Sequence, residues 1–141
     1  MLLRRLLTAL AGAAALVSLL FVSGCGEKPT PESVATEFAT AALDGDSAKV
    51  LKMLKFSEVA KEQKLSDTDA DVFKSKLKSG IEHQSESIKA AGGYKDVKAD
   101  PAEYSEDKKS ATVTVKYKVG DKEDSDTIKL KLINDEWVPQ L

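Results

Sequence analysis

The chain contains one cysteine, Cys25, and one histidine, His83. Its thiol chemistry and its histidine-based metal binding therefore depend on these two side chains. A cysteine thiolate is a strong nucleophile, and Cys25 has no second cysteine with which to form a disulfide. A histidine that binds a metal ion is accompanied by acids, cysteines or other histidines at ligand spacing. No such cluster accompanies His83, so we expect neither a metal site nor a cofactor.

The segment before Cys25 is built like an export signal. Arg4 and Arg5 precede an apolar run, residues 6–22, which is broken only by isolated small or hydroxyl residues. This run is a little short of the roughly 20 apolar residues of a membrane-spanning helix. A basic start, a short apolar run and a small-residue exit are typical of a signal peptide. The alternative is an uncleaved anchor with an incidental cysteine.

Val22, Ser23 and Gly24 lead directly into Cys25, and this stretch resembles the lipobox of a bacterial lipoprotein signal peptide. The resemblance implies transfer of diacylglycerol to the Cys25 thiol, cleavage before Cys25 and acylation, for example with palmitate, of the new amino terminus. Two or three acyl chains anchor a protein stably, so membrane lipid is the expected partner. Because Gly26 rather than aspartate follows, the resemblance points to the outer membrane in a cell that has one.

The sequence divides into three parts: a signal peptide (residues 1–24), a lipidated tether (25–29) and one domain (30–141). The tether reaches about 17 Å when fully extended, which keeps the domain near the lipid head groups. Both arginines lie in the signal peptide, so the remaining domain is acidic and has only lysines as basic residues. A domain without arginine is a poor candidate for nucleic-acid binding.

Helix signals occupy the first part of the domain. Thr30 is an N-cap residue followed by Pro31 at the first helical position, and Gly45 suits a left-handed C-cap. The stripe of this first helix consists of Val34, Phe38, Ala41 and Ala42. A short second helix carries Val50, Leu51 and Leu54. We expect residues 55–65 to form a loop with a helical turn.

The longest predicted helix begins at the capping-box serine, Ser66, and ends at Gly92-Gly93. Its apolar stripe consists of Phe73, Leu77, Gly80, Ile81, Gln84, Ile88 and Ala91. Glycine inside a helix costs roughly 1 kcal/mol relative to alanine, so Gly80 predicts a close approach of the helix to a sheet. His83 falls about 80° from the stripe and is expected at the surface. Gln84 is either a satisfied core amide or a cleft residue.

From Tyr94 onward the apolar residues alternate with period two, which predicts strands. Two strands cover residues 111–119 and 128–132, and a short last strand contains Trp137-Val138. An earlier strand lies within residues 94–104, where Pro101 indicates an edge or a bulge. Short turns make these strands antiparallel. The sequence therefore predicts an α+β domain with about four strands, whose apolar face the longest helix covers.

Three features carry a family resemblance: the Pro31-Glu32-Ser33 helix start with Phe38, the break at Ala42-Leu43-Asp44-Gly45-Asp46, and the closing Asn134-Asp135-Glu136-Trp137-Val138 hairpin. Together they resemble small bacterial lipoproteins with a cystatin-like or nuclear-transport-factor-like domain, the lumazine-binding-like group of unknown function. The resemblance covers most of residues 30–141. It implies a curved antiparallel sheet wrapped around helices, often with a cleft between them.

The resemblance implies that a cleft enzyme of this type would use an acid as general base and a tyrosine or a second acid as hydrogen-bond donor. Glu103 with Tyr94, Tyr104 and Tyr117 offers such a set. Gln84, Tyr104 and Tyr117 are the candidate cleft residues. No nucleophile elbow, phosphate loop or dinucleotide motif is present, and a fold alone does not define a function. We therefore expect no catalytic residue and predict a non-catalytic binding or accessory module in the cell envelope. The alternative is a small-molecule enzyme of the cleft type, isomerase-like or hydrolase-like.

Overall fold

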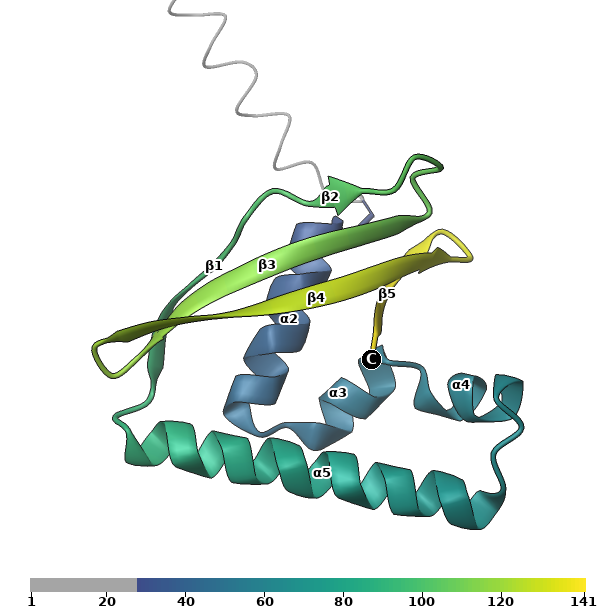
Figure 1. Ribbon diagram of the computed structural model, residues 1–141, viewed down its shortest axis with the longest axis horizontal. Coiled ribbons are helices and arrows are strands. Elements are labelled where there is room, and N and C mark those ends of the chain that lie inside the picture. Colours follow the sequence, from purple (N-terminus) through teal and green to yellow (C-terminus); the bar gives the residue numbers. More distant parts are fainter. Residues whose placement is uncertain (1–27) are drawn as a thin grey trace, which may run out of the picture.

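The computed structural model describes residues 28–141, in which helices precede strands (Figure 1). The predicted signal peptide, the lipobox residues Val22, Ser23 and Gly24, and the lipidation site Cys25 lie outside the described residues. The helices are α2 (Pro31–Asp44), α3 (Ser47–Met53), α4 (Phe56–Glu62) and α5 (Asp67–Ala90), and the strands are β1 (Tyr94–Ala99), β2 (Glu103–Tyr104), β3 (Ser110–Val119), β4 (Lys122–Ile133) and β5 (Glu136–Gln140).

The strands form one curved antiparallel sheet in the order β1-β3-β4-β5, with the two-residue β2 also paired to β3. The long β3–β4 hairpin is the centre of the sheet (Figure 1). β1 has a register shift between Lys95 and Lys98, and Pro101 separates β1 from β2. The edge position and the bulge agree with the prediction for this segment. The α+β fold class, with helices before a curved antiparallel sheet, is confirmed.

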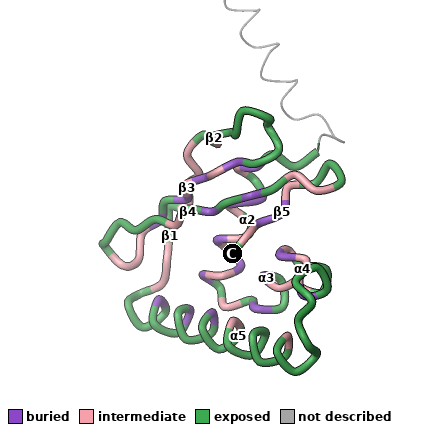
Figure 2. The backbone as a smooth tube through the Cα atoms, turned by 45° about the vertical axis from the view of Figure 1, so that its right-hand side comes forward, coloured by how far each residue is buried: buried purple, intermediate pink, exposed green. Residues whose placement is uncertain are grey.

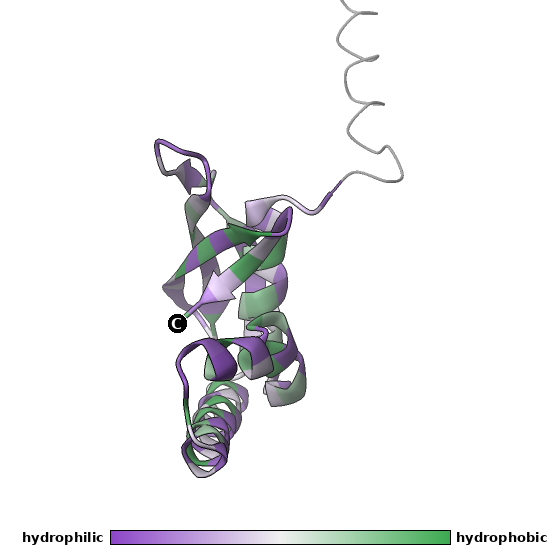
Figure 3. Cartoon of the chain, turned by 90° about the vertical axis from the view of Figure 1, so that its right-hand side faces the viewer, coloured by the Kyte–Doolittle hydropathy of each residue, from purple (hydrophilic) through white to green (hydrophobic). Residues whose placement is uncertain are grey.

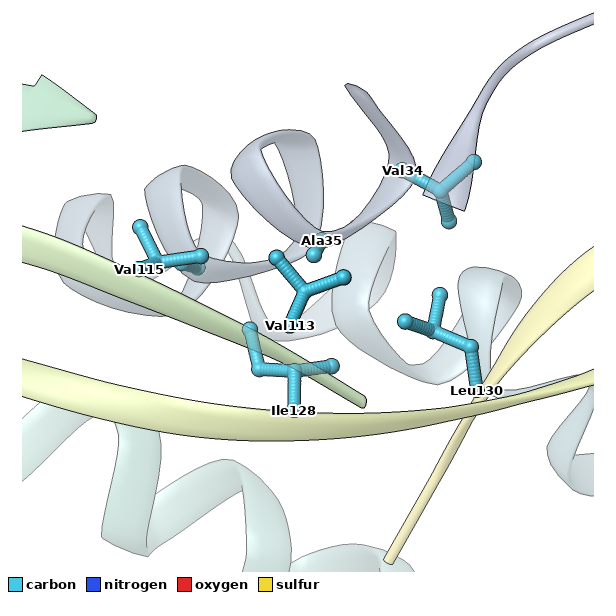
Figure 4. Packing of buried hydrophobic residues seen from close by; sticks show 7 residues of the cluster. Val34, Ala35, Val113, Val115, Ile128 and Leu130 are labelled. Atoms are coloured by element: carbon cyan, nitrogen blue, oxygen red, sulfur yellow. The ribbon is translucent and has the colours of Figure 1, made fainter. Parts of the chain in front are cut away.

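Helix α2 covers the apolar face of the sheet. Figure 4 shows Val34 and Ala35 of α2 packed against side chains of β3 and β4. The strand residues of this contact are Val113, Val115, Ile128 and Leu130. The buried alanines on α2 include Ala35 and Ala39, whose small side chains let the helix lie close to the strands. The main core therefore lies between α2 and the β3–β4 hairpin.

The prediction that the longest helix covers the sheet is wrong. Helix α5 packs on α2 and α3 instead, because α2 already occupies the apolar face of the sheet. Only Ile81, Ser85 and Ile88 of α5 are buried. In Figure 2 the buried segments of α5 lie on one side of the helix, and most of its remaining residues are exposed. Helix α2 thus lies against the sheet, and α5 crosses the end of α2, where Ile88 packs in one cluster with Leu43 and Tyr117 of β3.

The predicted close approach at Gly80 is also wrong. A Cβ atom at Gly80 would meet no other atom within 4 Å, because this position faces solvent. The close approach occurs at Gly45, which ends α2 with a left-handed φ of 79°. A Cβ atom at Gly45 would lie 2.8 Å from the buried Ser85 Oγ on α5. The glycine that lets two elements meet is therefore the helix C-cap.

Residues 55–65 contain a seven-residue helix, α4, which is longer than the single helical turn expected within a loop. Lys55 has a left-handed φ of 49° and turns the chain sharply before α4. α4 has no side-chain N-cap, which is why local signals do not reveal it. Its stability comes from tertiary contacts: Ala60 is buried, and the ring of Phe56 stacks on that of Phe73 in α5. No helix within residues 28–141 is long and apolar enough to cross a membrane.

Candidate ligand-binding cleft

The apolar surface of the described domain is concentrated around one cleft. Among residues 28–141 the large hydrophobic side chains that stay exposed are Leu65, Val72, Phe73, Tyr104 and Leu141. All of them except Tyr104 line the cleft. Val72 is 48% exposed and Phe73 is 42% exposed, although each lies on a helix with a buried face. An apolar patch gathered in a concave place is typical of a binding site.

The cleft lies between α4, the first half of α5 and the end of β5, and its volume is about 500 Å³. Figure 3 looks from the side on which α4 lies, and hydrophobic and hydrophilic segments alternate along α5 there. The apolar lining consists of Leu54, Phe56, Val59, Leu65, Val72, Phe73, Pro139 and Leu141. The polar lining consists of Gln63, Asp69, Lys76 and Gln140. The volume is suited to a small organic ligand.

Two local contacts hold the wall of the cleft that α5 provides. The rings of Phe56 and Phe73 stack with a centroid distance of 5.5 Å, which joins α4 to α5. At the start of α5, Ser66 Oγ accepts a hydrogen bond from the Asp69 amide at 3.1 Å. The same hydroxyl donates to Asp69 Oδ2 at 2.6 Å. These contacts set the start of α5 relative to α4 and so shape the cleft.

The sequence-predicted cleft residues separate into two places. Gln84 and Tyr117 line a second hollow of about 760 Å³ between the last turns of α5 and the β3–β4 turn. Tyr104 lies on β2, is 52% exposed and meets Trp137 edge-on with a centroid distance of 6.0 Å. The structure thus brings Gln84 and Tyr117 together and leaves Tyr104 at a different place. Gln84 itself is exposed, which rules out the core-amide reading.

Each of two tyrosines is bound to an aspartate. Tyr117 is buried on β3 and its hydroxyl donates to Asp126 Oδ2 at 3.0 Å. Burial, together with the negative charge of Asp126, raises the pKa of Tyr117 well above its ordinary value. The Tyr94 hydroxyl donates to Asp44 Oδ1 at 2.6 Å, and this bond raises the pKa of Tyr94 to about 12. Both hydroxyl groups therefore keep their protons to a higher pH than a solvent-exposed tyrosine does.

The postulated tyrosine–acid set does not converge on Glu103. Glu103 pairs with Thr112 near the start of β3, whereas Tyr94 pairs with Val119 at its end. Tyr117 belongs to the same end of β3 as Tyr94. The length of β3 separates Glu103 from these two tyrosines. His83 is exposed on α5, as predicted. Within the described part of the chain no three histidine, cysteine or acidic residues are grouped so as to hold a metal ion.

The cleft beside α4 was missed at the sequence level. Two of its residues, Phe56 and Val59, belong to the segment predicted as a loop, and Phe73 was assigned to the core stripe. The available signal was the number of apolar residues between positions 54 and 65, which exceeds what a solvated loop needs. A helical stripe does not distinguish a side chain in the core from one that lines a cleft.

The fold is that of a nuclear-transport-factor-like (NTF2-like) α+β domain. The structure is similar to the crystal structure at 2.00 Å of a "Putative NTF2-like transpeptidase" from Campylobacter jejuni, with a TM-score of 0.68. The two chains are 23% identical, and the match covers 80% of this chain and 99% of that one. At this identity the likeness shows the fold alone.

The chain belongs to a family described as a domain of unknown function, DUF4878, whose model matches residues 23–138. No curated protein matches the sequence. The family and the solved structure together confirm the expectation of a nuclear-transport-factor-like domain of unknown function.

Proposed function

We propose that this protein is a lipid-anchored, non-catalytic binding module of the cell envelope that holds an apolar ligand in the cleft between α4, α5 and β5. The observation that carries the proposal is the gathering of Leu65, Val72, Phe73 and Leu141 around one concave site. Exposing these side chains to water is unfavourable, and a ligand that covers them recovers the cost of hydration. An apolar cleft of about 500 Å³ fits this role.

The lipid anchor is part of the same proposal, and support for it comes from the sequence. Val22, Ser23, Gly24 and Cys25 have the order of a lipobox after a short apolar run. The described chain begins beside the β4–β5 turn, where Lys28 Nζ forms an ion pair with Asp135 Oδ2 at 3.3 Å. Helix α5 lies at the opposite end of the domain (Figure 1). The attachment point and the cleft thus lie at opposite ends of the domain, which leaves the cleft accessible from the aqueous side.

A binding role fits the lining of the cleft better than catalysis does. The name of the Campylobacter protein suggests peptidyl transfer, which proceeds through attack by a nucleophilic side chain. The lining of this cleft includes no serine, threonine, cysteine or histidine. Its polar members are Gln63, Asp69, Lys76 and Gln140, and Asp69 already accepts a hydrogen bond from Ser66. Such groups orient a ligand within an apolar site.

The proposal is tested on the fragment that comprises residues 28–141. The main core, which joins α2 to the β3–β4 hairpin, is formed by residues of that fragment. The match also covers 99% of the Campylobacter chain, which crystallised as a domain of this extent. The probe is N-phenylnaphthylamine, a neutral apolar fluorophore, titrated into the wild-type fragment, Val72→Gln and the matched control Ser79→Gln. Ser79 is exposed on α5 and is not part of the cleft lining.

We expect the probe to bind saturably to the wild-type fragment. Val72→Gln should weaken this binding by about fivefold to tenfold, because the apolar contact of one side chain with the probe is lost. The Ser79→Gln fragment is expected to bind as the wild type does. Binding that is absent, or equal in all three fragments, contradicts the assignment of the cleft.

A further inference from the structure

We propose that the ligand of the cleft is a single-chain amphiphile with an acidic head group, and that Lys76 binds this head group. The inference rests on the proposed function and adds the chemical class of the ligand. This inference follows from the charged side chains of the cleft and from their positions along α5. It also follows from the edge of β5, which offers few hydrogen-bonding groups to a peptide.

The unpaired side-chain charge of the cleft is positive. Asp69 and Lys76 are the charged side chains of the lining. Asp69 lies in the first turn of α5, where the helix dipole stabilises a negative charge, and its Oδ2 accepts a hydrogen bond from Ser66 Oγ at 2.6 Å. Lys76 has neither an ion pair nor a side-chain hydrogen bond with any residue of the described domain. An anionic ligand group supplies the partner that Lys76 lacks.

The positions on α5 place this charge beside the apolar part of the cleft. Residues three and four apart on a helix are neighbours on its surface, so Lys76 adjoins both Val72 and Phe73. Phe73 in turn stacks on Phe56 of α4. An amphiphile can therefore lay its chain along Val72 and the stacked rings while its head group meets Lys76. This arrangement calls for an apolar body directly attached to one acidic group.

The edge of β5 disfavours an extended peptide as the ligand. A peptide that adds a strand needs free N–H and C=O groups on the edge strand. Pro139, which lines the cleft, has no N–H group to donate. The Gln140 Nε2 group donates to the carbonyl oxygens of Val138 and Pro139 at 3.1 and 3.2 Å. The cleft can therefore recognise a ligand through apolar contact and one charged group, and a small amphiphile offers both.

The test compares three probes that share one alkyl chain: dodecanoate, dodecanol and dodecyltrimethylammonium, each below its micelle concentration. Binding to the fragment of residues 28–141 is measured by isothermal titration calorimetry. We expect dodecanoate to bind most tightly, and Lys76→Gln to weaken it by about threefold to tenfold. The same variant should leave dodecanol binding unchanged. Lys74→Gln is the matched control, because Lys74 is exposed on α5 outside the cleft lining.

The outcomes separate this inference from the proposed function. Equal binding of dodecanoate and dodecanol, unaffected by Lys76→Gln, overturns the acidic head group and leaves an apolar cleft in place. Tighter binding of dodecyltrimethylammonium overturns the inference and assigns the charge recognition to Asp69. If no dodecyl probe binds and N-phenylnaphthylamine also fails to bind, the cleft itself is refuted.

Discussion

The rings of Phe56 and Phe73 are stacked almost in parallel, with centroids 5.5 Å apart and an interplanar angle of 2°. Phe56 opens α4 and Phe73 lies in the second turn of α5, so the pair joins two helices across their connecting segment. Both rings line the apolar cleft. The contact that holds α4 in place is thus also a wall of the candidate binding site.

Removing one ring is expected to destabilise the domain and loosen α4. Phe56→Ala should lower the free energy of unfolding by about 1–2 kcal/mol, because the side chain is half-buried rather than fully buried. A double-mutant cycle with Phe73→Ala should show a coupling energy of about 0.5–1.5 kcal/mol. Urea denaturation of the four proteins measures both quantities. Strictly additive effects would show that the rings do not stabilise each other.

Substitution of two glycines by alanine should change stability in opposite directions. Gly45→Ala places a Cβ atom 2.8 Å from Ser85 Oγ at a left-handed φ of 79°, so we expect a loss of at least about 1–2 kcal/mol. Gly80→Ala adds a Cβ atom in open space on a helix, and we expect a gain of about 0.5–1 kcal/mol. Thermal unfolding of both variants measures the difference. A destabilising Gly80→Ala would reinstate a close approach at that position.

The contrast between these glycines shows what local sequence signals can predict. Helix ends are set by nearby atoms: the Ser33 amide donates to Thr30 Oγ1 at the start of α2, and Gly45 ends it. These ends were predicted correctly. Which helix covers the sheet depends on packing between distant segments. Helix α2 covers it because alanines such as Ala35 let α2 lie close to the strands. Periodicity alone assigned that role to the longest helix.

The candidate site was less predictable for the same physical reason. Inward alternation correctly placed Tyr117 in the interior of the sheet. The cleft depends on α4, a helix that lacks a side-chain cap and is held by the Phe56–Phe73 stack. No local sequence pattern encodes a contact between the rings of Phe56 and Phe73, which lie on different helices. The apolar stripe on α5 therefore predicts a core position for Phe73, whereas the ring of Phe73 lines the cleft.

The bond between Tyr94 and Asp44 predicts a stability change at alkaline pH. It raises the pKa of Tyr94 to about 12, above the ordinary value of 10.0. The folded state therefore holds this proton more tightly than the unfolded state, and the stabilisation is complete below pH 10. It is lost as the pH rises from about 10 to about 12.

The check is the pH dependence of urea denaturation for the wild type and Tyr94→Phe. The variant should lose less stability over this alkaline window, although Tyr117, whose pKa is also raised, still contributes. Identical pH dependence of the two proteins contradicts a strong hydrogen bond between Tyr94 and Asp44.

The proposed lipid anchor predicts that Cys25→Ser abolishes lipid attachment. The serine hydroxyl cannot replace the thiol as the acceptor of diacylglycerol, so metabolic labelling with a palmitate analogue should be lost. Retention in the membrane fraction is expected to fall as well. Gly26→Ala, which leaves the thiol in place, serves as the control and should still be labelled. Continued labelling of Cys25→Ser would remove the lipoprotein assignment.

The most direct test of a ligand-holding cleft is native mass spectrometry of the domain from the organism's own cell envelope. The fragment of residues 28–141 and its Val72→Gln variant are exported there, purified without detergent and measured side by side. We predict a reproducible small-mass adduct on the wild type that is reduced or lost in Val72→Gln, with Ser79→Gln behaving as the wild type does. A bare mass for the wild type, or an adduct that Val72→Gln retains in full, contradicts a ligand held in this cleft.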